Sequence, residues 1–125
     1  MLSDLLKSIT TIYIIYGATD FRKQIASLYS IVEKDLKINP YSKIAFIFCN
    51  RKRNSIKILC YDRNGFILAQ KTLLDQNKMK FQWPRNKGEL GQITKEQLNW
   101  LLSGLKIHQD KYFKDIEINR EKIAV

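Results

Sequence analysis

Three short apolar segments, separated by two tight turns between Ile44 and Leu74, constrain the fold of this chain most strongly. Ile44–Cys49 is a continuous apolar run, which indicates a strand that is buried on both faces. Ser55–Tyr61 alternates between apolar and polar residues, and Phe66–Leu74 follows an Asn-Gly pair, a strong hairpin signal. The block therefore predicts a three-stranded antiparallel meander.

The first hairpin of this meander also fixes the expected environment of both cysteines. If the chain turns at Arg51–Asn54, Cys49 lies opposite Ile56 and Cys60 lies opposite Ala45. The cysteines are then not cross-strand neighbours, so we expect two small apolar core residues and no disulfide. With one histidine and no Cys-x-x-Cys motif, the sequence predicts no metal and no other cofactor.

A strand and a helix are expected before the meander. Ile9–Tyr16 is rich in β-branched and aromatic residues, which favours a strand. Thr19 or Asp20 can cap a following helix, whose apolar residues recur at spacings of three and four up to about Lys37. Asn39-Pro40 ends that helix, because the residue before proline is disfavoured in the helical region.

After the meander, the pattern predicts a short strand, a loop and a second helix. Phe81–Trp83 is the expected strand, and Arg85–Gln92 is a polar loop. Thr94-Lys-Glu-Gln97 is a capping box that opens the helix. Residues 108–125 form a C-terminal extension, for which a mobile tail and a last strand both remain open.

This element order indicates an α+β fold in a single domain over residues 1–107. Its sheet should be mainly antiparallel, with four to five strands. The side chains expected to be buried are Phe21, Leu28, Phe46, Ile58 and Leu102, with Trp83 largely so.

The positive charge of the chain is concentrated in its middle. Between Leu36 and Gly88 there are twelve Lys or Arg residues and two acids, so this stretch alone accounts for the whole net charge of +10. Such a concentration points to a polyanionic partner, most plausibly nucleic acid. The alternative is a solvated basic face in a chain whose composition is rich in Ile, Lys and Asn.

Several sequence blocks stand in a distinctive order, and together they resemble a known family. The blocks are Gly17-Ala-Thr-Asp-Phe-Arg-Lys23, the stretch Phe48–Asp62 closed by Gly65-Phe66, Lys71-Thr-Leu73, Phe81-Gln-Trp-Pro84 and the helix end at Leu105. In this order they resemble the small accessory protein of the sixty-six family of insertion sequences, often called TnpB. The resemblance covers Ile9 to Ile107.

The resemblance implies a bacterial mobile-element protein that supports transposition. The expected partners are DNA, with transposon ends favoured, and the separate transposase of the same element. The family pattern falls on Gly17, Thr19, Asp20, Arg22, Lys23, Arg51, Arg53, Lys57, Asp62, Gly65, Phe66, Trp83 and Pro84.

The strongest candidate for a DNA contact is the basic turn of the first hairpin, Arg51-Lys52-Arg53. Turns favour Gly, Asn and Asp, and three adjacent cations repel one another, so they contribute nothing to the turn itself. A cationic hairpin can enter a major groove or follow a DNA backbone. Lys57, in the next strand, is expected to extend this surface.

Four further basic residues are candidate phosphate contacts. Arg22 and Lys23 stand beside the predicted helix start, where free amides favour anions, although a solvated role is equally open. Arg85 and Lys87 follow the aromatic segment Phe81–Trp83, whose aromatic rings are expected to pack in the core rather than stack on bases.

An enzyme is the alternative class to weigh. Asp20, Asp62, Asp75 and Glu89 could gather around a metal for phosphoryl transfer, but Asp20 is placed as a cap and Asp62 begins a turn. His108 has no evident Ser or Cys partner, and no glycine-rich phosphate loop is present. We therefore expect no catalytic residues.

Two further expectations concern the mode of action and the compartment. A basic adaptor that docks on the transposase and aids its recruitment to DNA, without specific DNA binding of its own, remains the alternative function. The start of the chain lacks a basic signal region, and no apolar run reaches the roughly 18 residues that span a bilayer, so the sequence predicts a cytoplasmic protein.

Overall fold

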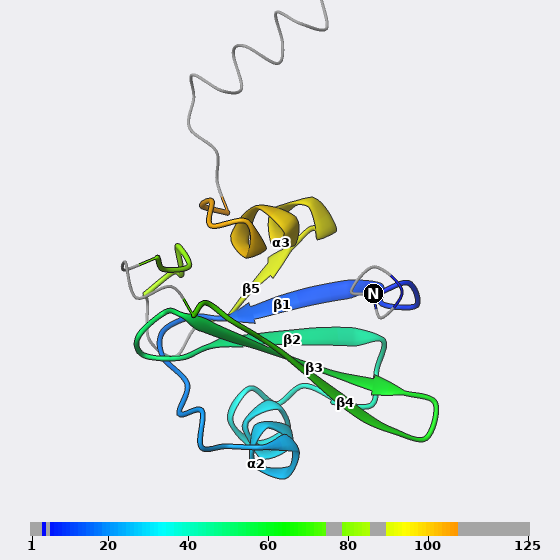
Figure 1. Ribbon diagram of the computed structural model, residues 1–125. Helices are drawn as coiled ribbons and strands as arrows, with labels where there is room; N and C mark the ends of the chain where they lie inside the picture. The colour runs from blue at the N-terminus through cyan, green and yellow to red at the C-terminus, as the bar shows by residue number, and fades with distance from the viewer. Residues whose placement is uncertain (1–3, 5, 75–78, 86–89, 108–125) are drawn as a thin grey trace, which may run out of the picture.

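A five-stranded sheet with helices on both faces forms the centre of the molecule (Figure 1). The computed structural model describes residues 4, 6–74, 79–85 and 90–107. The strand order is β4-β3-β2-β1-β5. In chain order the elements are β1 (Thr11–Ile15), α2 (Ile25–Ser30), the π-helix η1 (Ile31–Asp35), β2 (Ile44–Cys49), β3 (Ser55–Asp62), β4 (Gly65–Thr72), β5 (Leu90–Ile93) and α3 (Lys95–Leu102).

The predicted meander is confirmed, including its register. β2, β3 and β4 are antiparallel neighbours. Cys49 pairs with Ile56 and Cys60 pairs with Ala45, as the turn position required. Both thiols are free and buried.

The sheet is mixed, because β1 lies parallel to β2 while the other three pairings are antiparallel. A parallel pair needs a crossover connection, and the α2–η1 helical segment provides it. The expected α+β class with a mainly antiparallel sheet is therefore confirmed.

The segment from 81 to 93 differs from the prediction. Phe81–Trp83 is not a strand, since the Trp83 N–H donates back to the Phe81 carbonyl, and β5 overlaps the end of the predicted loop and pairs antiparallel with β1. The side chain of Tyr16, directly after β1, lies so close over Gly91 of β5 that a Cβ on Gly91 would collide with its ring. Glycine at this position leaves room for that ring, a role that a sequence pattern alone could not distinguish from a loop.

The first helix also begins later than expected. Neither Thr19 nor Asp20 caps it, because the N-cap residue is Gln24, which makes no side-chain capping bond. The Asp20 carboxylate instead accepts the backbone N–H of Arg22 at 2.9 Å and closes a local turn. The chain then enters α2 at Ile25, and its last turn widens into η1.

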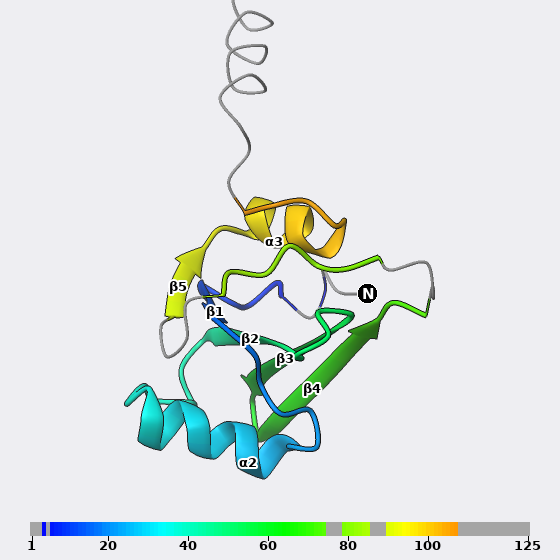
Figure 2. The ribbon, with the colours of Figure 1, turned by 90° about the vertical axis from the view of Figure 1, so that its left-hand side faces the viewer.

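Each face of the sheet buries its own apolar cluster, as the turned view shows (Figure 2). α3 covers the face that contains Ala45, Ile47 and Cys49 of β2. α2 and η1 cover the face that contains Phe46 and Phe48. The continuous apolar run of β2 is thus explained by burial on both sides.

Most of the predicted core residues are buried. Leu28, Phe46, Ile58 and Trp83 are buried as expected. Phe21 and Leu102 are only half-buried, so those two predictions are wrong. Phe21 lies in the turn before α2, and Leu102 is the last residue of α3, where the helix leaves the sheet.

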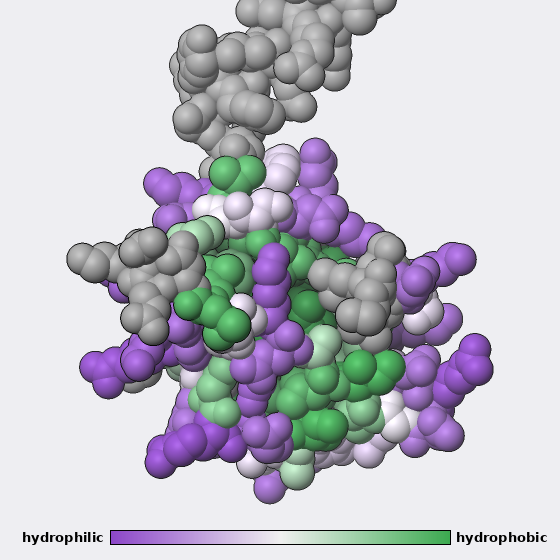
Figure 3. All heavy atoms as spheres, in the orientation of Figure 1, coloured by the Kyte–Doolittle hydropathy of each residue, from purple (hydrophilic) through white to green (hydrophobic). Residues whose placement is uncertain are grey.

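The edge strand β4 leaves apolar surface at one side of the molecule. Its residues Phe66, Ile67, Leu68 and Ala69 are half-buried. Figure 3 shows apolar surface over β3 and β4, surrounded by hydrophilic side chains.

The remaining expectations concern the ends of the chain and membranes. The C-terminal extension 108–125 lies outside the described residues. Within the described part of the chain, no helix has the length and apolar character needed to cross a bilayer.

Candidate nucleic-acid interface

The turn between β2 and β3 is held rigidly by its own asparagines. The side-chain oxygen of Asn50 accepts the backbone N–H groups of Asn54 and Ser55 at 3.0 and 3.1 Å. The Asn50 amide nitrogen donates to the Asn54 side-chain oxygen at 2.7 Å. Arg53 adopts a left-handed backbone conformation with φ of 58°, which completes the defined backbone of this turn.

The segment 79–85 is attached to this turn and to the end of β1. The Phe81 N–H donates to the Arg53 carbonyl at 2.7 Å. The Trp83 indole N–H donates to the Ile15 carbonyl at 2.9 Å, and the Pro84 carbonyl accepts the Gly17 N–H at 2.9 Å. These bonds gather the turn, segment 79–85 and the loop after β1 at the left of Figure 1.

Two adjacent clefts, which we call the arginine clefts, lie at this end of the sheet. Their volumes are about 340 and 450 Å³. Arg53 and Arg85 line both, and Arg51 lines the smaller one. Trp83 lines both clefts but is only 5% exposed, so it supports their walls rather than offering a free ring. No acidic side chain is among the described residues that line them.

The structure therefore brings together three of the predicted contacts. Arg51 and Arg85 are exposed and Arg53 is half-buried. Lys52 is exposed on the same turn but lines neither cleft. Lys87 lies outside the described residues.

Lys57 does not belong to the basic surface, contrary to the prediction. Its side chain is only 2% exposed and points to the α2 face of the sheet. Its ammonium donates to the carbonyls of Phe21 and Lys23 at 3.1 and 2.8 Å and lies 4.9 Å from the centre of the Phe21 ring. Burial lowers the pKa of this ammonium. Lys57 thus holds the 20–24 turn in place.

Arg22 and Lys23 lie on that same turn and line neither arginine cleft. The Arg22 guanidinium forms an ion pair with Asp20 at 2.7 Å. The hydrogen bonds from Arg22 lower the pKa of the Asp20 carboxyl to about 2. Because Asp20 already balances the charge of Arg22, this residue is a weaker candidate for a phosphate contact than the cleft arginines.

Comparison with known proteins supports a family assignment. The family model described as IS66 Orf2 like protein matches residues 10–112. The chain belongs to the IS66 Orf2-like family. The "Uncharacterized protein y4hO" of Sinorhizobium fredii (strain NBRC 101917 / NGR234) is similar, with 34% identity over 94 residues that cover 75% of this chain and 79% of the relative. No solved structure shows a significant match.

Membership confirms the resemblance drawn from the sequence blocks. This IS66 Orf2-like protein is an accessory protein of insertion-sequence transposition.

Across the described residues, no three His, Cys, Asp or Glu side chains gather in a way that could hold a metal ion. Burial raises the pKa of the Cys49 thiol to about 12 and also raises that of Cys60, which disfavours the nucleophilic thiolate.

Sequence reasoning missed Lys106, which lines the larger arginine cleft. Lys106 lies shortly after the end of α3, far along the chain from the basic turn. No local signal connects the two segments. They share a surface only in the folded protein, where Lys106 and Arg53 both line the larger arginine cleft.

Proposed function

We propose that this IS66 Orf2-like protein binds the DNA backbone through the arginine clefts as a non-catalytic accessory of transposition. Arg51, Arg53 and Arg85 contact phosphates, and Lys52 adds charge at the rim. The guanidinium group suits this role, because its planar donors match phosphate oxygens. Transposon ends are the DNA on which such an accessory protein acts, and the transposase is its protein partner.

One observation supports this proposal above all. Three arginines from two segments, about 30 residues apart in sequence, line clefts whose described residues include no acid. Without a polyanion, their mutual repulsion is uncompensated in these clefts. A merely solvated basic face would not need a turn fixed by Asn50 and attached to segment 79–85.

The test is the salt dependence of binding to duplex DNA. Each phosphate contact releases about 0.9 of a condensed counterion. The triple variant Arg51→Gln, Arg53→Gln, Arg85→Gln should therefore make the slope of log affinity against log salt shallower by roughly 2 to 3 units. Fluorescence anisotropy with labelled duplex, at several salt concentrations, measures it.

A charge-matched control separates local contacts from net charge. Lys34, Lys37 and Lys95 are exposed and line neither arginine cleft. Their triple change to Gln removes the same charge and should leave the slope nearly unchanged. If the cleft variant and the control have equal slopes, direct binding through the clefts is wrong. End-specific binding that appears only with the transposase would then favour the adaptor function.

A further inference from the structure

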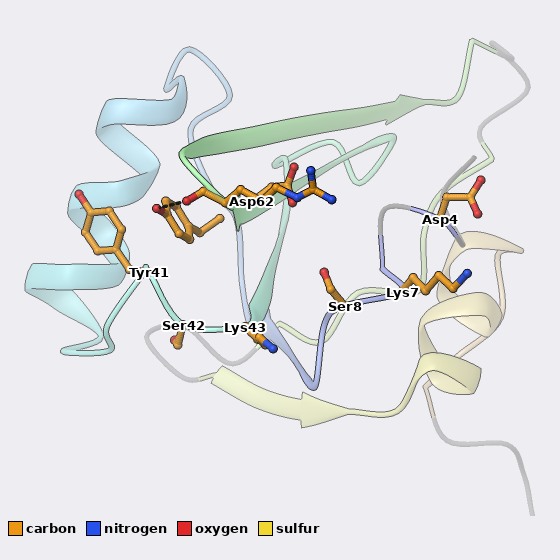
Figure 4. A pocket seen from close by; sticks show the side chains of 9 residues that line it. Asp4, Lys7, Ser8, Tyr41, Ser42, Lys43 and Asp62 are labelled. Carbon is orange, nitrogen blue, oxygen red and sulfur yellow. Dashed lines mark hydrogen bonds between the residues drawn. The ribbon is translucent and has the colours of Figure 1, made fainter.

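A third cleft lies at the other end of the sheet and has a different character. Its volume is about 670 Å³. Its walls come from three parts of the chain: Asp4, Lys7 and Ser8, residues 41–43 before β2, and residues 61–63 at the β3–β4 turn (Figure 4). β2 and β3 separate it from the arginine clefts by roughly 20 Å. It is not a continuation of that surface.

An exposed aromatic ring forms one side of this cleft. Tyr41 is 52% exposed, yet its ring is held by aromatic neighbours. The centre of its ring lies 5.1 Å from that of Tyr61, 5.3 Å from that of Phe66 and 5.7 Å from that of Tyr29. The Tyr29 hydroxyl donates to Glu33 at 2.8 Å and so anchors the cluster to η1. The Tyr41 ring is thus held in place by its neighbours while half of the residue stays exposed, so it has little freedom to lose on binding.

Cations surround the same cleft on fixed backbone. Lys7, Lys43 and Arg63 line it and are exposed. The Lys43 carbonyl accepts the Thr10 N–H at 3.0 Å, and the Arg63 carbonyl accepts the Tyr61 hydroxyl at 2.6 Å. Their charged ends can therefore reach phosphates from anchored positions.

Acids also line this cleft, which distinguishes it from the arginine clefts. Asp4 and Asp62 are exposed there, and Ser8 adds a hydroxyl. Two carboxylates are unfavourable for a phosphate-only ligand. They suit a ligand that also carries amino donors, as the edges of cytosine, adenine and guanine do.

We propose that this cleft binds one nucleotide of an unpaired DNA strand. The base stacks on Tyr41, its amino group donates to Asp62 or Asp4, and the flanking phosphates lie near Lys43 and Arg63. The volume falls in the range of small-ligand sites, which fits a nucleotide. An unpaired base is required, since both faces of a paired base are covered by its neighbours in the duplex.

The test compares strand and duplex binding by variants of Tyr41. The probes are a labelled mixed-sequence single strand of about 12 nucleotides and the matching duplex. Tyr41→Ala should weaken single-strand binding by about 5- to 150-fold, the loss expected for one stacked base. Duplex affinity should stay within twofold. Tyr41→Phe and Tyr41→Trp should bind the strand as the wild type does.

Tyr41→Leu is the control for a loss of folded protein, because leucine retains apolar packing but has no aromatic face. It should lose strand affinity like Tyr41→Ala while its thermal unfolding stays close to that of the wild type. The proposal would be overturned if Tyr41→Leu and Tyr41→Ala bound the strand as tightly as the wild type. It would also be overturned if these variants lost as much affinity for the duplex as for the strand. If free 5′-dGMP displaced the labelled strand completely at an equal concentration, the cleft would be a site for mononucleotides, and its assignment to a strand would be wrong.

Strand binding beside Tyr41 is a different function from duplex binding through the arginine clefts, and the two can be tested independently. The arginine triple variant should retain the dependence of strand binding on Tyr41. Conversely, the Tyr41 variants should keep the salt slope of duplex binding.

Discussion

At the scale of single residues, Lys57 shows best how the surroundings of a side chain determine its role in the protein. The alternation of β3 places it opposite Phe48, on the face that α2 covers. A lysine there is expected at the surface, but the 20–24 turn folds over it and supplies two carbonyl acceptors. No local pattern in the sequence predicts that the 20–24 turn covers Lys57.

Replacing Lys57 by Met tests this structural role. The variant keeps an apolar stem of similar length but loses two charge-assisted hydrogen bonds and the contact with the Phe21 ring. Relief from burying a charge offsets part of that loss, so we expect the free energy of unfolding to fall by about 1–3 kcal/mol. Urea unfolding followed by circular dichroism measures it. Lys52→Met, on the exposed turn, should change it by less than about 0.5 kcal/mol. Equal stabilities of the two variants would refute the role given to Lys57.

At the scale of elements, the local parts of the fold could be predicted and the non-local parts could not. The meander and its register follow from neighbouring turns and apolar runs, and the Thr94–Gln97 capping box is present as expected. β5 could not be predicted, because it is a strand only through its pairing with β1, about 75 residues earlier. The candidate site divides in the same way. Arg51 and Arg53 are local, whereas their meeting with Arg85 depends on the bond between Arg53 and Phe81.

The close fit of the Tyr16 side chain over Gly91 gives a prediction for β5. In Gly91→Ala, the new Cβ would meet the Tyr16 ring, which packs against the core cluster under α3. Displacing that ring should lower the free energy of unfolding by about 1–3 kcal/mol, the usual effect of overpacking. Gly65→Ala is the matched control, since its Cβ would meet nothing within 4 Å. Thermal unfolding of both variants measures the effect, and a Gly91→Ala protein as stable as the control would show that the Tyr16 ring moves aside without cost.

At the scale of the whole molecule, the sheet separates distinct surfaces. The arginine clefts lie where β2 ends, and the cleft beside Tyr41 lies where β2 begins. A single DNA molecule that bends or melts could contact both ends at once. Under these two proposals, the protein would hold DNA in a particular state for a separate enzyme.

The same separation underlies the last prediction, which concerns catalysis. Metal-dependent phosphoryl transfer needs carboxylates gathered around ions about 4 Å apart. Asp20 lies near the end of β2, because the adjacent Thr19 N–H donates to the Cys49 carbonyl, whereas Asp62 ends β3 at the far side. Asp20 is also occupied by Arg22.

With Mg²⁺ or Mn²⁺ and supercoiled plasmid, we therefore expect neither nicking nor strand joining by the purified protein. Gel electrophoresis of the plasmid, with and without chelator, measures both. A nicking activity that requires the metal and disappears in Asp62→Asn would contradict the non-catalytic role. Nicking that persists in Asp62→Asn and separates from the protein on further purification would instead identify a contaminating nuclease.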